Sequence, residues 1–252
     1  MKKKWFGIVI CIAVLIMCMP SAAIANNRTS ILFIGNSLTF RSNFVGQFRS
    51  VCKSAGKKVW VDSYAVGGSY FSKYANRSTT VGRQAYQKIH SRKWNYVVLQ
   101  ENTDWITARP GRSKKAAKTL IRWIREKSPD AQIIYNASWA YKHGYRMFGE
   151  FYTFSKNQSL LNKNYRMLQE KFGGTVAYTG NAFRKYRKKY STPALYVSDN
   201  NHPTTGGAYL AACTIYATMF GSTDGITYRG SCSAKTARHM RQIAESVCEQ
   251  VP

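Results

Sequence analysis

Short apolar runs alternate along the chain with longer segments whose apolar residues recur at helical spacing. The short runs are rich in β-branched and aromatic residues, which predicts strands. They lie at 30–35, 58–65, 96–100, 132–139 and 175–180. Continuous apolar strands that are separated by helices are typical of a mostly parallel sheet covered on both faces. The pattern therefore predicts an α/β fold, a three-layer α/β/α sandwich around a five-stranded sheet.

The longer segments predict the helices of the two outer layers. They lie at 44–56, 81–91, 113–131 and 159–174. The first stops at a glycine, a common helix terminator. The third is closed by Ser128-Pro129, because proline disfavours helical geometry in the residue before it.

Polar residues and glycines stand where the predicted strands end. Ligands of open α/β sheets bind beyond the carboxyl ends of the strands, so these residues are candidates for a site. A further candidate loop follows the apolar run ALYV and carries an aspartate three places before a histidine. Together the strand ends offer a hydroxyl, a glycine turn, a carboxamide and an Asp/His pair: Ser37, Gly67-Gly68, Gln100-Glu101-Asn102, and Asp199 with His202. These groups are the components of acyl-transfer chemistry.

A serine hydroxyl is a weak nucleophile at neutral pH, and it needs a base whose tautomer and direction are fixed. Ser37, His202 and Asp199 supply these three roles, since the Asp-x-x-His spacing lets the carboxylate bond the imidazole on the same loop. We therefore predict a Ser-His-Asp triad. Taken singly, each residue has a structural explanation, such as a helix cap for Ser37 or a surface hydrogen bond for the Asp/His pair.

Negative charge that develops on a substrate carbonyl requires preorganised N–H donors. The candidates are the backbone amides of Ser37 and Gly68 and the side chain of Asn102. Gly67 is an adjacent alternative to Gly68, and Gln100 competes with Asn102. Glu101 is expected to pair with a lysine and is left out of the mechanism.

Four blocks of the sequence resemble the motifs of the SGNH hydrolases, also called GDSL-like esterases. The blocks follow the family's order over nearly the whole chain: IGNSLT (34–39), AVGGS (65–69), VVLQENTD (97–104) and DNNHP (199–203). The resemblance implies a flavodoxin-like sandwich and gives the triad and oxyanion roles to the residues already named. Two blocks depart from the family pattern. Asn36 stands where the name motif has aspartate, and the third block reads Gln-Glu-Asn-Thr where the family commonly has Gly-x-Asn-Asp.

The amino terminus reads as a bacterial Sec signal peptide, with three lysines, a short apolar run and a small-x-small ending before Ala25. Cleavage there leaves a single domain at 26–252 and a secreted or extracytoplasmic protein without a stable membrane span. An uncleaved anchor stays an alternative, as does a lipoprotein at Cys18. Losing the three lysines lowers the net charge from +27 to +24. A positive charge of this size attracts polyanions. The alternative is that it only keeps the protein soluble or loosely retained at a surface.

Four cysteines remain after cleavage, and in an exported chain an even number favours disulfides. We expect Cys232 to pair with Cys248 and Cys52 with Cys213, with buried thiols as the alternative. No Cys/His spacing suggests zinc, so neither a metal nor a cofactor is expected.

The predicted function is that of a secreted serine esterase, which removes O-acetyl or other short acyl esters from a carbohydrate. An anionic envelope or extracellular polysaccharide is one candidate for that carbohydrate. An O-acyltransferase on the same scaffold and a non-catalytic binding protein for anionic polymers are the alternatives. Trp139 and Tyr141, within the aromatic segment 136–157, are candidate sugar-binding residues, unless they only pack over the sheet edge. The basic run 183–190 is a candidate polyanion contact or a solvated helix face. We expect a monomer and no specific nucleic-acid binding.

Overall fold

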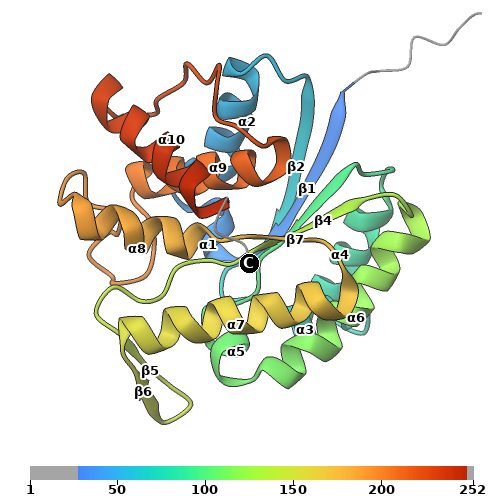
Figure 1. Ribbon diagram of the computed structural model, residues 1–252. Helices are drawn as coiled ribbons and strands as arrows, with labels where there is room; N and C mark the ends of the chain where they lie inside the picture. The colour runs from blue at the N-terminus through green and yellow to red at the C-terminus, as the bar shows by residue number, and fades with distance from the viewer. Residues whose placement is uncertain (1–27, 249–252) are drawn as a thin grey trace, which may run out of the picture.

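The computed structural model describes residues 28–248, and a parallel sheet forms its centre (Figure 1). All five predicted strands are present. They are β1 (Thr29–Gly35), β2 (Val59–Ala65), β3 (Tyr96–Leu99), β4 (Gln132–Asn136) and β7 (Thr175–Ala177). Each neighbouring pair is parallel, in the order β2-β1-β3-β4-β7. The α/β/α prediction is confirmed.

Burial on both faces of the sheet explains the continuous apolar runs. In β1, Ile31 and Phe33 belong to the core on one face, whereas Leu32 and Ile34 belong to the core on the other. None of the four is more than 1% exposed. Successive side chains of a strand point to opposite faces, so only a strand covered on both sides requires apolar residues at every position.

Two layers of helices cover the sheet, as Figure 1 shows. One face is covered by α2 (Phe44–Ser54), α8 (Thr179–Lys189), α9 (Thr205–Phe220) and α10 (Ala234–Cys248). The other is covered by α3 (Phe71–Tyr74), α4 (Thr80–His90), α5 (Thr103–Ala108), α6 (Pro110–Lys127) and α7 (Phe154–Phe172). The short α1 (Ser37–Phe40) and the 3-10 turn η1 (Arg41–Asn43) follow β1. The predicted helices are confirmed, and α6 ends before Ser128 as expected.

The strand order places the ends of β1 and β3 side by side. β1 lies between β2 and β3, and Ile34 of β1 pairs with Leu99 of β3. The residues that follow the two strands therefore meet at the carboxyl edge of the sheet, at the point where the strand order reverses. Ligands of such sheets bind at this point.

A small hairpin has no counterpart in the predicted elements. It consists of β5 (Tyr145–Met147) and β6 (Glu150–Tyr152), which pair antiparallel and project beyond the helices near α5 and α7 (Figure 1). The apolar run before the Asp/His loop also differs from a strand. It forms only one isolated bridge, between Tyr196 and Pro203.

The expected disulfides are absent from the described part of the chain. Cys52 and Cys213 are buried free thiols, and burial raises the pKa of each to about 12. Cys232 faces Met240, with 3.9 Å between the sulfur atoms, and Cys248 donates to the carbonyl oxygen of Ala244 at 3.3 Å. The expected pairing of Cys232 with Cys248 fails because Cys232 lies two residues before α10, whereas Cys248 is the last residue of that helix. The length of α10, about 20 Å, lies between them, whereas a disulfide needs Cα atoms within about 7 Å.

The predicted signal peptide, 1–25, lies outside the described residues. Between residues 28 and 248, no helix is both long and apolar enough to cross a membrane. The apolar helix α9 has 16 residues, and every residue from Gly206 to Ala217 is buried.

Candidate active site

Ser37 is the first residue of α1, directly beyond the carboxyl end of β1. Asn36 fixes this turn in three ways. Its side-chain oxygen accepts from the Leu38 amide at 3.1 Å, its side-chain nitrogen donates to the Ser69 carbonyl at 3.1 Å, and its backbone amide donates to Oε1 of Gln100 at 2.9 Å. An ionised aspartate has no N–H to give to Ser69. Asn36, which stands where the name motif has aspartate, therefore makes a contact with Ser69 that an aspartate could not make, and this contact joins the serine block to the glycine block.

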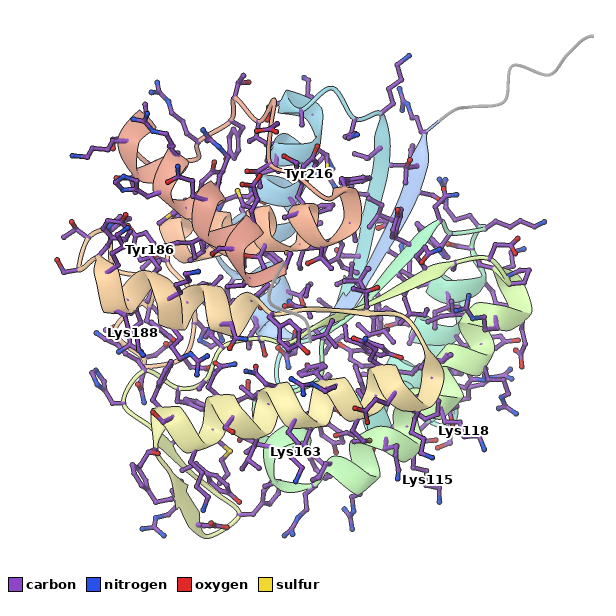
Figure 2. All side chains as sticks on the ribbon, in the orientation of Figure 1. Lys115, Lys118, Lys163, Tyr186, Lys188 and Tyr216 are labelled. Atoms are coloured by element: carbon purple, nitrogen blue, oxygen red, sulfur yellow. The ribbon has the colours of Figure 1, made fainter. Side chains whose placement is uncertain are left out.

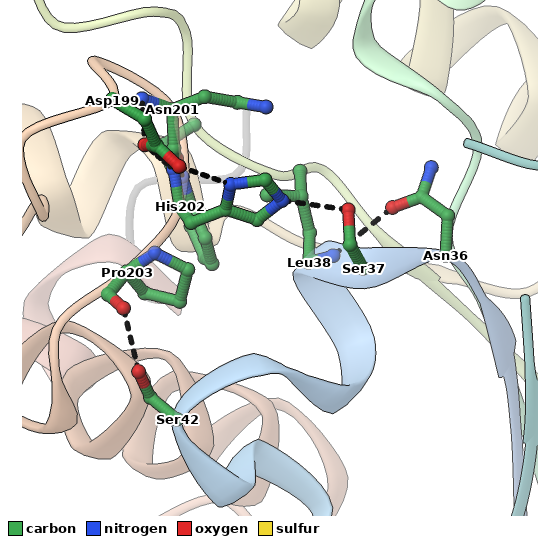
Figure 3. Close-up of polar contacts among 9 residues, drawn as sticks. Asn36, Ser37, Leu38, Ser42, Asp199, Asn201, His202 and Pro203 are labelled. Atoms are coloured by element: carbon green, nitrogen blue, oxygen red, sulfur yellow. Dashed lines mark hydrogen bonds and ion pairs between the residues drawn. The ribbon is translucent and has the colours of Figure 1, made fainter. Parts of the chain in front are cut away.

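Ser37, His202 and Asp199 form a continuous hydrogen-bonded chain (Figure 3). Oγ of Ser37 lies 2.7 Å from Nε2 of His202, and Nδ1 of His202 lies 2.5 Å from Oδ2 of Asp199. Oδ1 of Asp199 accepts from the backbone amides of His202 at 2.8 Å and Asn201 at 3.0 Å. Ser37 and His202 are 165 positions apart in the sequence. The fold brings both together with Asp199, and the histidine lies between the serine and the aspartate as predicted.

The surroundings of Asp199 fix the tautomer of His202. Partial burial favours the neutral acid, but the hydrogen bonds from the His202 amide, the His202 ring and the Asn201 amide outweigh it and lower the pKa of Asp199. An ionised carboxylate only accepts hydrogen bonds, so Nδ1 carries the proton that it donates to Asp199. In the neutral ring Nε2 is then an acceptor for the Ser37 hydroxyl, as a general base requires.

Two side chains from other elements hold the loop that carries Asp199 and His202. Nε1 of Trp139 donates to the Asn201 carbonyl at 2.8 Å. Oγ of Ser42, in η1 beyond Ser37, donates to the Pro203 carbonyl at 2.6 Å, which Figure 3 shows. The loop is therefore anchored both to the segment after β4 and to the segment after Ser37.

Trp139 is not exposed to bind a sugar. It is 0% exposed and stacks on Phe183, with ring centroids 4.1 Å apart. The expectation that it lines a substrate cleft is wrong, because its ring packs into the core and its indole N–H holds the loop that carries Asp199 and His202. Tyr141 is partly exposed, donates to Oδ1 of Asp104 at 2.9 Å and stacks on Tyr145. Burial raises the pKa of Asp104, and the bond from Tyr141 opposes that rise.

The structure separates the two glycines of the second block. Gly68 has φ +65°, is exposed, and would have no atom within 4 Å of an added Cβ. Gly67 has no such positive φ, and a Cβ there would meet the ring of Phe40 at 3.9 Å. Only Gly68 thus occupies a backbone conformation that disfavours other residues. This difference agrees with the choice of Gly68 as the candidate oxyanion donor.

Asn102 caps α5 with one end of its amide. Its Oδ1 accepts from the backbone amides of Asp104 at 2.9 Å and Trp105 at 3.4 Å. The cap occupies the acceptor end and leaves the NH₂ group as the donor. Gln100, by contrast, uses both ends internally: Oε1 accepts from Asn36 and Thr39, and Nε2 donates to the Glu101 carbonyl. Gln100 is also only 1% exposed, so Asn102 is the better candidate for the oxyanion donor.

Glu101 does not pair with a lysine, and the expectation that it would do so is wrong. It is 1% exposed, and its Oε1 accepts from the backbone amides of Phe71 at 2.8 Å and Asn102 at 2.7 Å. The carboxylate thus joins the start of α3, just after the glycine block, to Asn102 of the asparagine block. Burial raises its pKa to about 7, although the bonds from the amides of Phe71 and Asn102 act in the opposite direction. Sequence reasoning missed this role, because no pattern shows which strand-end carboxylate points inward.

Comparisons with protein-family models and with curated proteins gave no match. Solved structures are similar over most of the chain. A DUF4886 family protein from Bacteroides uniformis has a TM-score of 0.74 at 14% identity, over 89% of this chain and 96% of that one. A proposed SGNH hydrolase from Slackia heliotrinireducens has a TM-score of 0.66 at 22% identity, over 77% of this chain and 100% of that one.

The periplasmic domain of a lipopolysaccharide acetyltransferase from Salmonella ser. Paratyphi A has a TM-score of 0.54 at 14% identity, over 78% of this chain and 85% of that one. Other similar structures are named as a lipase from a goat rumen metagenome and a lipase/acylhydrolase from Enterococcus faecalis. Identities this low establish the architecture rather than the activity. The five-stranded parallel sheet with helices on both faces matches these structures, and the chain has the fold of the SGNH hydrolases.

Proposed function

We propose that this protein is a serine esterase that removes acetyl or other short acyl groups from a carbohydrate. The observation that carries the proposal is the hydrogen-bonded chain from Ser37 through His202 to Asp199. In it the nucleophile, the base and the group that orients the base lie within hydrogen-bond reach in the order that ester hydrolysis requires.

Acylation begins when Oγ of Ser37 attacks the ester carbonyl. Nε2 of His202 takes the hydroxyl proton, and Asp199 stabilises the imidazolium that forms. The charge on the carbonyl oxygen is stabilised by the amides of Ser37 and Gly68 and by the side chain of Asn102. When the tetrahedral intermediate breaks down, the C–O bond to the alcohol breaks, and His202 gives the proton to the departing oxygen. An acyl group then remains on Ser37.

Deacylation repeats these steps with water. His202 accepts a proton from the water as its oxygen attacks the acyl carbon. The same donors stabilise the second intermediate, and the bond to Oγ of Ser37 breaks as His202 returns the proton. The products are a carboxylic acid and the free enzyme.

The excess of positive charge favours a carbohydrate that carries negative groups. Most lysines and arginines among the described residues have no carboxylate within ion-pair distance. The exceptions are Lys88, Arg122 and Lys156. Figure 2 shows Lys115 and Lys118 on α6, Lys163 on α7 and Lys188 on α8 on one face of the molecule. Unpaired charge of one sign raises the local concentration of a polyanion. The unpaired positive charge and the signal-like amino terminus together support action outside the cytoplasm, on an acylated envelope or extracellular polysaccharide.

Acyl transfer to a sugar hydroxyl is the second candidate function. The similarity to an acetyltransferase periplasmic domain favours it, because the same fold occurs there. The chemistry differs only in the group that attacks the acylated Ser37, which is a sugar hydroxyl instead of water.

Acetate release tests the proposal. We expect the purified protein to release acetate from p-nitrophenyl acetate and from an O-acetylated uronic-acid polysaccharide. Ser37→Ala is expected to lower kcat by about a thousandfold or more, since it removes the nucleophile. The matched control is Ser54→Ala at the end of α2, whose hydroxyl only donates to the Val51 carbonyl; it is expected to keep the wild-type rate.

Equal rates from the wild-type and Ser37→Ala proteins would contradict the serine mechanism. Adding an unacetylated oligosaccharide to the same reaction separates the two candidate functions. Hydrolysis leaves the acceptor unchanged in mass, whereas transfer adds an acetyl group to it.

A further inference from the structure

Three aromatic side chains and two arginines form a continuous surface beside the candidate active site. We call it the aromatic–arginine surface, and it consists of Tyr70, Trp105, Phe148, Arg109 and Arg112. Tyr70 and Trp105 stack with centroids 4.3 Å apart and an interplanar angle of 17°, and Phe148 meets Trp105 edge to face at 5.6 Å. Arg109 lies over the Phe148 ring at 4.8 Å and Arg112 over the Trp105 ring at 5.7 Å. The five side chains come from three separate segments of the chain.

The surface adjoins the groups that would bind the reacting ester. Tyr70 follows Ser69, whose carbonyl accepts from the side chain of Asn36 beside the nucleophile. Trp105 lies in the first turn of α5, and its backbone amide donates to Oδ1 of Asn102. Tyr70 and Trp105 therefore follow closely on the segments that carry the candidate oxyanion donors Gly68 and Asn102.

Phe148 is held in an unfavourable backbone conformation at the tip of the hairpin. Its φ is +48°, and Gly149 follows with φ +89°. Two positive φ values suit a type I′ turn, in which asparagine and glycine are preferred and a bulky aromatic residue is disfavoured. The ring nevertheless remains 50% exposed. A half-exposed ring on a strained turn is a candidate for contact with a ligand.

The charge of the surface is uncompensated. Among the described residues, no carboxylate lies within ion-pair distance of Arg109 or Arg112, and both are exposed. Glu150, the acid in the strands of the hairpin, is bound by Lys156 at 2.5 Å. A guanidinium binds a carboxylate through two parallel N–H donors, and an aromatic ring packs against the apolar face of a sugar.

We propose that the aromatic–arginine surface binds a glycan chain whose sugars carry carboxylates, as in a polymer of uronic acids. Phe148 and Tyr70 contact the sugar faces, and Arg109 and Arg112 bind the carboxylates. That the glycan is the substrate rests on the proposed esterase function, whereas its binding to this surface does not.

Binding of unacetylated hexamers tests the surface without hydrolysis. The probes are hexagalacturonic acid and the neutral maltohexaose, titrated calorimetrically into the wild-type protein at low salt. We expect hexagalacturonic acid to bind at least about tenfold more tightly than maltohexaose, because only it presents carboxylates to the arginines. Arg109→Gln is expected to raise the Kd for hexagalacturonic acid by about fivefold to tenfold. Arg122→Gln, which removes the same charge about 20 Å from Arg109 along α6, is the matched control and should leave Kd within about twofold.

Phe148→Asn separates binding from folding. Asparagine suits the positive φ of this turn, so the variant should melt at the same temperature as the wild type or higher. It should nevertheless raise the Kd for hexagalacturonic acid by about tenfold, because the exposed ring is lost. The proposal is overturned if the wild type binds neither hexamer, if both bind equally, or if Phe148→Asn and Arg122→Gln bind alike. Because the hexamers carry no ester, a failure here leaves the acetate-release result standing, and the converse holds.

Discussion

Replacing His202 with alanine is expected to lower kcat for p-nitrophenyl acetate by about a thousandfold or more. Without the imidazole, the Ser37 hydroxyl has no base at 2.7 Å and the leaving alcohol has no acid. Residual activity above the uncatalysed rate should remain, because the oxyanion donors are untouched. Initial rates at saturating substrate measure the loss.

In the proposed mechanism Ser37 and His202 act as one unit, so the effects of their substitutions on kcat should not add. The double variant Ser37→Ala/His202→Ala is expected to be about as slow as either single variant. His143→Ala is the matched control, since His143 is exposed and only its backbone amide contacts the catalytic loop, at Oδ1 of Asn200. A double variant slower than the singles by the product of both losses would show that the two residues act independently, against the proposed mechanism.

Replacing Glu101 with glutamine is expected to remove a pH-dependent cost to folding. The pKa of Glu101 rises from 4.5 to about 7 on folding, so between these values the folded state binds more protons than the unfolded state. The stability from this group is complete below about pH 4.5 and is lost as pH rises through 7. A shift of this size corresponds to about 3 kcal/mol of unfolding free energy. The folded-state groups facing the carboxyl are the hydroxyls of Tyr165, Tyr74 and Ser113, and no basic group is among them.

Urea unfolding from pH 4.5 to pH 8 measures this effect. Stability of the wild type relative to Glu101→Gln should fall by up to about 3 kcal/mol across that range. Taking the difference between the two proteins cancels the titration of the other groups, such as Asp104, whose raised pKa acts in the same direction. Glu170→Gln, on the exposed surface of α7, should follow the wild-type curve within about 0.5 kcal/mol. Parallel curves for the wild type and Glu101→Gln would show that folding does not raise the pKa of Glu101.

The sequence pattern predicted the fold because the sheet is buried on both faces. Runs such as 30–35 and 96–100 need apolar residues at every position, and this signal is strong. Parallel strands also end at one edge, so the positions after β1, β3 and the later loop were expected to converge. The hydrogen bonds from Ser37 to His202 and Asp199 agree with that expectation.

The direction of single side chains could not be predicted from the same pattern. Trp139 and Phe148 both lie in the aromatic segment 136–157, yet Trp139 is fully buried and Phe148 is half exposed. The difference depends on the hairpin turn, which Phe148-Gly149 form without the usual asparagine. Glu101 was likewise indistinguishable from a surface acid, because its partners are backbone amides that leave no mark on the sequence.

Covalent labelling tests most directly whether Ser37 is a nucleophile activated by His202. The purified wild-type protein would be treated with a fluorophosphonate, which phosphonylates activated serines, and then examined by intact mass and peptide mapping. We expect a single adduct on the peptide that contains Ser37, and we expect its formation to slow by about a hundredfold or more in His202→Ala. Absence of the adduct from the wild type, its appearance on another serine, or an unchanged rate in His202→Ala would contradict the proposed catalytic triad.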